Sequence, residues 1–350
     1  MMLLKKISKY IKDKKNNGAN ITVPKSQGED ENFIQNLPLK TFVEKPAEVI
    51  EEKDKKLRIK QVKYESDQSG FVYFLDGIER KTVLFNYDFI PVIYGYVAAV
   101  IMKRTDKQMH FAGLEDKKEN IYLPYKENGD EPEHYFNLHD FAEYDLIPVN
   151  TGKKDRETKE YPLFSEEFNN KARGEIQKFR TNIEQDLAKK WLNQKYDDGW
   201  LFVDGRLSTK SRNLLSDPRV VGVTKSHHAY YFAPEDQFKI YNLKKGERSS
   251  VFRLEKKYEE YEKEDVYSWY LRLYNNNYNG NNTFGIIRVE IPADEELVKQ
   301  ADKISGWILL ETKPVAFPAS RWDRMIYPIK YCEDYLRAKA PSWALIESML

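Results

Sequence analysis

The sequence predicts an α/β fold in which a mixed sheet is flanked by helices. Segments rich in β-branched and aromatic residues recur between turn-forming residues, which is typical of strands. One long stretch carries apolar residues three and four apart, as in a helix that packs on one face. Two apolar segments, "FVYFLD" and "GWLFVD", each end on an aspartate that is followed by glycine. We therefore expect a sheet that carries both aspartates and a long helix that packs on it.

Composition indicates a soluble globular protein. The chain has 350 residues, of which 41% are hydrophobic and 32% charged, and its formal net charge is +1. This length holds one large domain or two ordinary ones. The longest apolar stretch, residues 89–102, contains proline and glycine and is shorter than the about 20 residues of a membrane helix. The N-terminus lacks the pattern of a secretory signal, so we expect a cytoplasmic protein without a membrane partner.

Cysteine and histidine offer no metal site. The single cysteine, Cys332, excludes an internal disulfide and a cysteine-rich zinc site. The histidines at 110, 134 and 139 lack the four-residue spacing that places two ligands on one face of a helix.

The composition of residues 1–55 predicts an N-terminal arm or linker, which precedes a folded domain over residues 56–350. Residues 1–15 fit a short basic helix with one apolar face, made of Leu3, Leu4, Ile7 and Ile11. The residues from 16 to 55 are polar and weakly periodic, which is typical of a mobile linker. The apolar face favours docking on a partner protein, and a disordered basic tail is the alternative.

The folded domain should begin with three or four sequential strands between residues 57 and 104. Residues 105–165 are charged and read as an irregular insert. A long helix follows, with one apolar stripe at positions 168, 172, 176, 179, 183, 187 and 191. Glu184 and Asp186 lie on opposite shoulders of this stripe, and periodicity lets either point toward the sheet.

The remaining elements complete the sheet. "GWLFVD" is followed by strand signals in "DPRVVGVTKS", "HAYYFA", "VYSWYLRLYN" and "FGIIRVEIP", and Pro328 fits the first turn of a C-terminal helix. This order, with an acid on two strands and on two helices, is the succession by which an RNase H-like fold builds a carboxylate cluster.

The two Asp-Gly pairs have two interpretations. Asp-Gly after an apolar run is a strong hairpin signal, which makes both pairs simple turns. Alternatively, Asp76 and Asp204 sit at the ends of neighbouring buried strands and share a metal ion. Mg²⁺ and Mn²⁺ prefer carboxylate oxygens, and two such ions can clamp the attacking and leaving oxygens of a phosphodiester.

Two basic segments suggest contact with a nucleic acid, although solvated loops have the same composition. The first follows Asp204 and includes Arg206, Lys210 and Arg212. The second, residues 238–257, includes Lys244, Lys245 and Arg248 with interleaved aromatic residues.

From about residue 70 to 338 the chain resembles the NurA nucleases, which accompany the hexameric HerA translocase. The resemblance lies in the order of "FLDG", "FRTNIE", "LFVDGRL", "VVGVTKS", "LKKGERSSVF", "WYLRL", "IIRVEIP" and "YPIKYCED". It departs from the family in "DGIE", where a small hydroxyl residue usually follows the glycine. It also departs in Glu333 and Asp334, where the family tends to have alanine and then Asp or His.

The resemblance implies a metal-dependent DNA nuclease, with exonuclease and also endonuclease activity, in DNA end processing or phage defence. It implies Asp76, Glu184 and Asp204 as ligands of Mn²⁺ or Mg²⁺, with Glu333 or Asp334 as the fourth. It places Lys225 beside the scissile phosphate and Tyr327 near the site, and it implies a homodimer that works with a HerA-like hexameric ATPase. A non-catalytic nucleic-acid-binding or partner-docking protein on the same fold is the alternative, and an RNA-cleaving enzyme is a third possibility.

Overall fold

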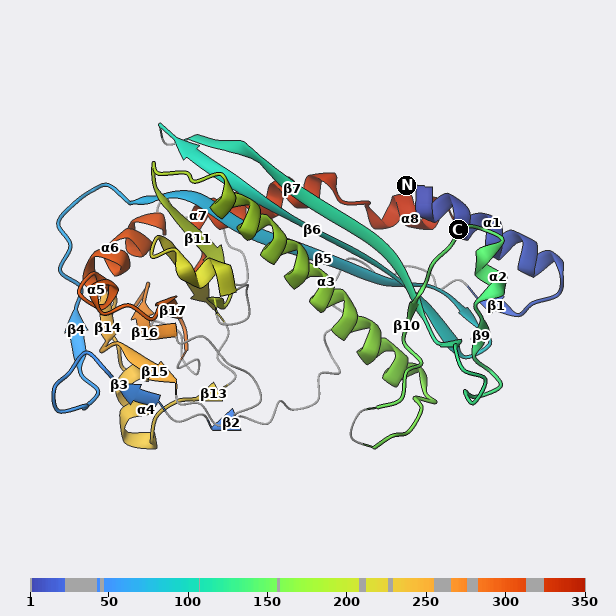
Figure 1. Ribbon diagram of the computed structural model, residues 1–350, viewed down its shortest axis with the longest axis horizontal. Helices are drawn as coiled ribbons and strands as arrows, with labels where there is room; N and C mark the ends of the chain where they lie inside the picture. The colour runs from blue at the N-terminus through green and yellow to red at the C-terminus, as the bar shows by residue number, and fades with distance from the viewer. Residues whose placement is uncertain are drawn as a thin grey trace.

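A computed structural model describes residues 2–22, 43–44, 47–106, 108–155, 158–207, 212–225, 229–254, 266–275, 283–312 and 324–349. In these residues a 13-stranded mixed sheet is the centre of the fold (Figure 1). Its main path has the order β10-β7-β6-β5-β11-β12-β17-β16-β14-β4, and β1, β3 and β15 pair off this path. The predicted α/β class is confirmed.

Most strands of the sheet are short, but three are long. The long strands are β5 (Phe71–Tyr87), β6 (Ile90–Thr105) and β7 (Gln108–Leu123). The others are β1 (Ile21–Thr22), β3 (Ala47–Val49), β4 (Ile59–Gln61), β10 (Val149–Asn150), β11 (Trp200–Asp204), β12 (Val220–Thr224), β14 (Glu247–Ser249), β15 (Phe252–Leu254), β16 (Val266–Arg272) and β17 (Ile286–Pro292). Two small sheets pair β2 (Val43–Glu44) with β13 (Ala229–Tyr230) and β8 (Tyr125–Lys126) with β9 (Phe136–Asn137).

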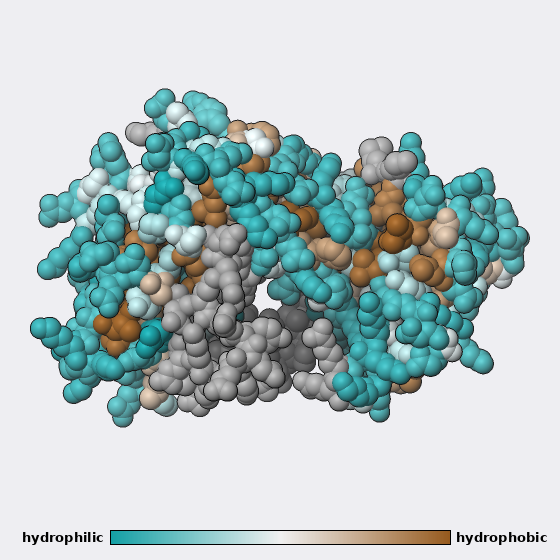
Figure 2. Space-filling view, in the orientation of Figure 1, coloured by the Kyte–Doolittle hydropathy of each residue, from teal (hydrophilic) through white to brown (hydrophobic). Residues whose placement is uncertain are grey.

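The helices are α1 (Met2–Asn16), α2 (His139–Ala142), α3 (Ser165–Asn193), α4 (Pro234–Tyr241), α5 (Glu295–Val298), α6 (Ala301–Glu311), α7 (Tyr327–Lys339) and α8 (Trp343–Ser348). Within the described ranges, none of them is long and apolar enough to cross a membrane. The surface in Figure 2 is mainly hydrophilic, with small separate hydrophobic patches.

Helices α3 and α7 cover opposite faces of the long strands. The predicted apolar stripe of α3 is buried, apart from half-buried Phe179, and packs on the face formed by Tyr73, Leu75 and their neighbours. Helix α7 packs on the other face, where Phe74 and Ile78 lie. Because side chains alternate along a strand, odd and even positions of β5 belong to two different cores.

Strand β5 corrects the expectation that an apolar strand ends at Asp76. It continues without a break through Asp76 and Gly77 to Tyr87, and both residues pair with β6, opposite Val100 and Ala99. The hairpin interpretation of this Asp-Gly pair is therefore wrong. The long ladder with β6 satisfies the backbone here, and it outweighs the local turn preference of the two residues.

The charged region after residue 105 is more regular than predicted. Its first part is β7, a 16-residue strand paired with β6 in an antiparallel ladder. Exposed and half-buried positions predominate in the middle of β7, so its charged side chains remain in water while its backbone is bonded. The middle of β7 therefore lacks the alternation of apolar and polar residues by which strands were predicted from the sequence.

The predicted N-terminal helix is present as α1, but its apolar face is not free. Leu4, Ile7 and Ile11 are at most 1% exposed and belong to the main core. Tyr10 stacks on Phe141, with ring centroids 4.7 Å apart. The prediction that this face docks on a partner is wrong, because the chain itself covers it. Residues 23–42 and 45–46 of the expected arm lie outside the described residues.

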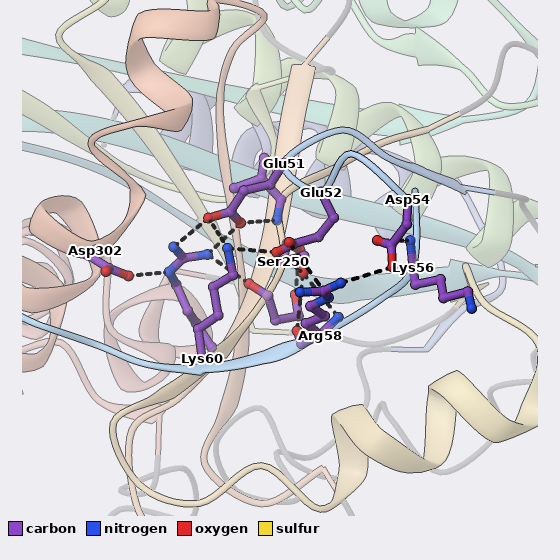
Figure 3. A network of polar contacts seen from close by, with 11 residues as sticks. Glu51, Glu52, Asp54, Lys56, Arg58, Lys60, Ser250 and Asp302 are labelled. Carbon is purple, nitrogen blue, oxygen red and sulfur yellow. Dashed lines mark hydrogen bonds and ion pairs between the residues drawn. The ribbon is translucent and has the colours of Figure 1, made fainter.

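Residues 47–61 join the sheet beside β14 and β15, and a buried ion network holds them there (Figure 3). Strand β3 pairs with β15, and β4 pairs with β14. Arg248 on β14 is 3% exposed and donates to both carboxylate oxygens of Glu51, at 2.8 and 2.9 Å, and to Asp302 at 2.6 Å. Lys60 also donates to Glu51, at 2.7 Å. The network fixes a segment from early in the chain to the sheet edge.

We expect Glu51→Gln to lower the free energy of unfolding by about 3 kcal/mol, because it leaves part of a buried ion pair without its partner. Burial raises the pKa of Glu51, but the hydrogen bonds and charge of Arg248 outweigh this and lower it to about 2. The stabilisation by this carboxylate is complete above about pH 4.5 and is lost as the pH falls toward about 2.

Urea unfolding of the variant and the wild type across this pH range measures the difference, which should shrink with acid. The matched control is Asp54→Asn, whose exposed ion pair with Arg58 should matter little. A constant difference between pH 7 and pH 2 would contradict the role of the carboxylate charge.

Candidate functional site

The site forms where β11 ends beside the continuing strand β5. The two strands are parallel, and Val203 is the partner of Leu75. The next residue on each strand is an aspartate, Asp204 on β11 and Asp76 on β5. Neighbouring strands lie about 4.8 Å apart, so the sheet itself sets these two acids side by side. The sequence prediction that they belong to neighbouring strands is confirmed, although only Asp204 stands at a strand end.

Asp76, Asp204 and Lys225 lie on the α7 face of the sheet. Asp76 and Asp204 alternate in step with Phe74 and Phe202, which belong to the core under α7. Lys225 follows β12, which pairs with β11 and places Val223 opposite Asp204. Lys225 Nζ is 3.0 Å from Asp204 Oδ1. The lysine that follows the third strand thus contacts Asp204.

Glu184 reaches the same point from the α3 face. Its side chain is buried, whereas Asp186 is 58% exposed and pairs with Lys189. Glu184 lies against Gly77, and a Cβ on Gly77 would overlap Glu184 Oε1. Gly77 is therefore a close-approach residue, which lets a carboxylate from the helix reach the backbone of β5. Of the two acids that periodicity left open, only Glu184 faces the sheet.

The acids repel one another strongly. Burial raises the pKa of Asp76 well above its ordinary value, and the charges of Asp204 and Glu184 raise it further, while Lys225 opposes the shift. Burial lowers the pKa of Lys225, but Asp204 and Asp76 outweigh this and raise it. The Asp76 Oδ1 atom accepts the Gly77 N–H at 2.7 Å. This excess of negative charge is what a bound cation would relieve.

Helix α7 brings one of its two candidate acids to the site. The charge of Glu333 contributes to the raised pKa of Lys225. Asp334 is 60% exposed and pairs with Lys330. Tyr327, 41% exposed, begins α7, and Arg324 just before it donates to the Lys225 carbonyl at 2.8 Å. Glu333 has a partner on its own helix too, because Arg337 Nε donates to Glu333 Oε1 at 2.9 Å. The effect of its charge on Lys225 is the reason for preferring Glu333 to Asp334 as a candidate, and the Arg324 hydrogen bond holds the start of α7 beside the end of β12.

The predicted basic residues are divided. Arg206 is half-buried directly after the Asp204-Gly205 turn, and Lys244 and Lys245 are exposed before β14. Arg248 is buried in the ion network with Glu51, so the prediction that it contacts DNA is wrong. Lys210 lies outside the described residues, as does the side chain of Arg212.

Arg180, on α3 one turn before Glu184, is a member of the site that sequence reasoning missed. Its Nε lies 3.5 Å from Glu184 Oε1 and 4.0 Å from Glu79 Oε2. The available signal was its four-residue spacing from Glu184 on one helix face.

The carboxylate oxygens of the site are of the type that binds a hard divalent cation. The side chains are, however, not arranged around one point. Carboxylates from two strands and a helix supply the oxygen ligands that Mg²⁺ and Mn²⁺ prefer. Among the described residues, however, no three His, Cys, Asp or Glu side chains are spaced to hold an ion. Lys225 and Arg180 contact the acids instead. Binding an ion would require the carboxylates to turn from these cations onto it.

Comparison with known proteins gives one match. The family model described as the NurA domain matches residues 87–323, which is more than half of the chain. The matched range includes Glu184, Asp204 and Lys225, and Asp76 precedes it. No curated protein matches the chain.

We expect Gly77→Ala to disable the site without unfolding the protein. The new methyl group would displace the Glu184 carboxylate. The rate of any cleavage that depends on this acid should therefore fall by about 10-fold to 100-fold. The control is Gly174→Ala on α3, where a Cβ meets nothing within 4 Å and should favour the helix. Cleavage assays and thermal melting of both variants test this. Full activity of Gly77→Ala would contradict the close approach of Glu184.

Proposed function

The chain belongs to the NurA family of nucleases, and we propose that it is a metal-dependent deoxyribonuclease. It hydrolyses phosphodiester bonds as an exonuclease, with endonuclease activity as a second mode. The observation that carries this proposal is the neighbouring position of Asp76 and Asp204 on paired strands, with Glu184 packed against Gly77 and Lys225 on Asp204.

In this proposal Asp76, Asp204 and Glu184 hold Mn²⁺ or Mg²⁺, with Glu333 as a fourth acid. A bound ion of this kind lowers the pKa of water and offsets the charge that develops on a phosphate. The partial burial of the acids keeps their electrostatic interactions strong. The site is built on strands and helices, which hold its side chains more firmly than loops would.

Lys225 supplies a positive charge at the phosphate. If Asp204 were to bind a cation, the Lys225 ammonium, now 3.0 Å from Asp204 Oδ1, would be available to the phosphate oxygens, where charge increases in the transition state. Tyr327 stands at the start of α7 as a further polar group for the substrate.

The proposed partners are DNA, a second copy of the chain and a HerA-like hexameric ATPase, in DNA end processing or phage defence. Family membership is the support for the ATPase and the dimer. Because the apolar face of α1 is buried, the ATPase would bind elsewhere on the folded chain.

Incubation with labelled single-stranded and double-stranded DNA and with RNA, each with Mn²⁺, Mg²⁺ or chelator, tests the function. We expect DNA to be cleaved with either ion and to remain intact with chelator. Binding of DNA without cleavage under every condition would favour the non-catalytic alternative. Cleavage of RNA alone would contradict the proposed substrate.

Glu184→Gln should reduce the rate of cleavage by about 10-fold to 100-fold, because it removes a charged oxygen ligand from the site. Asp186→Asn is the matched control on the same helix, and its exposed carboxylate should be dispensable. Initial rates in Mn²⁺ measure both variants. The reverse order of the two effects would exclude Glu184 as the helix ligand.

Asp76→Asn should abolish cleavage yet stabilise the metal-free protein at neutral pH. Because the pKa of Asp76 is raised on folding, the folded state binds more protons than the unfolded state above about pH 3.8. The stability of the metal-free wild type therefore falls as the pH rises through this window, and the variant escapes this loss.

Melting curves in chelator should show the advantage of Asp76→Asn at pH 7 and its disappearance below about pH 3.8. A variant less stable than the wild type at pH 7 would mean that the acids are not in repulsive contact.

A further inference from the structure

Arg180 stands among the acids of the site. It lies on α3, one helical turn before Glu184, and its side chain is 34% exposed. The Glu79 carboxylate is its second neighbour and comes from β5, two residues after Gly77 and on the same face. Arg180 thus touches the acid cluster from the α3 side, as Lys225 touches it from the α7 side.

The guanidinium of Arg180 is less well bonded than those of Arg248 and Arg104. Arg248 makes four hydrogen bonds of 2.6 to 3.0 Å, and Arg104 forms two to Glu311 and one to the Phe71 carbonyl. The contacts of Arg180 are ion pairs of 3.5 and 4.0 Å, longer than hydrogen bonds. Its buried Nε has no acceptor among the described residues. Donors of this kind are costly to leave unbonded.

Arg180 is also held in a strongly negative environment. The carboxylates of Glu184 and Glu79 lie 3.5 and 4.0 Å from its Nε, and a guanidinium is not deprotonated in proteins. If a divalent cation bound Glu184, the charge and the donors of Arg180 would lose this partner.

We propose that Arg180 binds a phosphate of the DNA strand that is cut. The inference rests on the proposed nuclease function and adds a substrate ligand to it. A planar guanidinium presents paired N–H donors that match two phosphate oxygens, and such charged hydrogen bonds are among the strongest in proteins. The side chain is exposed enough for a phosphate to reach it, and buried enough for the contact to be little screened. Before DNA binds, Arg180 offsets the repulsion between the acids.

The experiment compares Arg180→Met and Arg180→Lys with the wild type, using KM and kcat on a short DNA in Mn²⁺. Loss of the charged hydrogen bonds should raise KM about 10-fold to 100-fold in Arg180→Met. Arg180→Lys should recover part of the loss, because it restores the charge without the paired donors. Binding of Mn²⁺ to the DNA-free protein, followed by electron paramagnetic resonance, should be as tight as in the wild type or tighter, since a competing cation has been removed.

Lys178→Met is the matched control, because Lys178 lies on the same helix, is 67% exposed and, among the described residues, makes a long ion pair with Glu175 at 3.7 Å. It should change KM less than about 3-fold. Melting curves in chelator verify that every variant is folded.

Two results would overturn the role of Arg180. One is an unchanged KM in Arg180→Met. The other is a raised KM that is accompanied by a parallel fall of Mn²⁺ affinity and kcat, which would make Arg180 a structural support of Glu184. If the wild type cleaves nothing, the proposed function fails separately, and fluorescence anisotropy with DNA in chelator still decides the point. Weaker binding by Arg180→Met than by Lys178→Met would then support the phosphate contact, and equal binding would exclude it.

Discussion

A short parallel strand that ends beside a long one is the constraint on which the site depends. Strand β11 pairs with β5 only as far as Leu75. Between Asp76 and Phe85, β5 has β6 on one side and no described strand on the other. Asp76 and Asp204 lie on the α7 face of the sheet, and Glu184 approaches Gly77 from the α3 face. The end of β11 is therefore the point on the sheet that acids from both faces approach.

The two glycines that follow the aspartates serve different physical needs. Gly205 has a φ of 113°, which other residues rarely adopt, and its N–H donates to the Val223 carbonyl at 2.8 Å as the chain leaves β11. Gly77 is in an ordinary strand and is required because the Glu184 carboxylate occupies the space of a side chain. The same dipeptide thus marks a bend at the end of a strand at one position and a close approach at the other, and neither pair forms a hairpin, because β11 and β12 are parallel.

Apolar periodicity, strand-forming composition and turn residues in the sequence predicted those helices and strands that depend on local sequence alone. The apolar stripe of α3, the strands β11, β12, β16 and β17 and the start of α7 near Pro328 all agree with the sequence. Adjacent aspartates also followed from the strand order. The predictions that were wrong concerned residues whose structure depends on partners far away in the sequence. The burial of Arg248 depends on Glu51, 197 positions away in sequence, and the course of β5 through Asp76 depends on β6. Similarly, the choice of Glu333 over Asp334 depends on Lys225, which lies on another element.

We propose that the negative charge at the end of β11 is the reason for cation binding. The most direct test is a crystal structure of the protein with Mn²⁺, in which anomalous scattering locates the ion. We predict an ion about 2.1 Å from carboxylate oxygens of Asp76, Asp204 and Glu184, with Lys225 and Arg180 turned away from these acids. An ion bound elsewhere, or a site in which Lys225 stays on Asp204 and no ion is present at saturating Mn²⁺, would contradict the account.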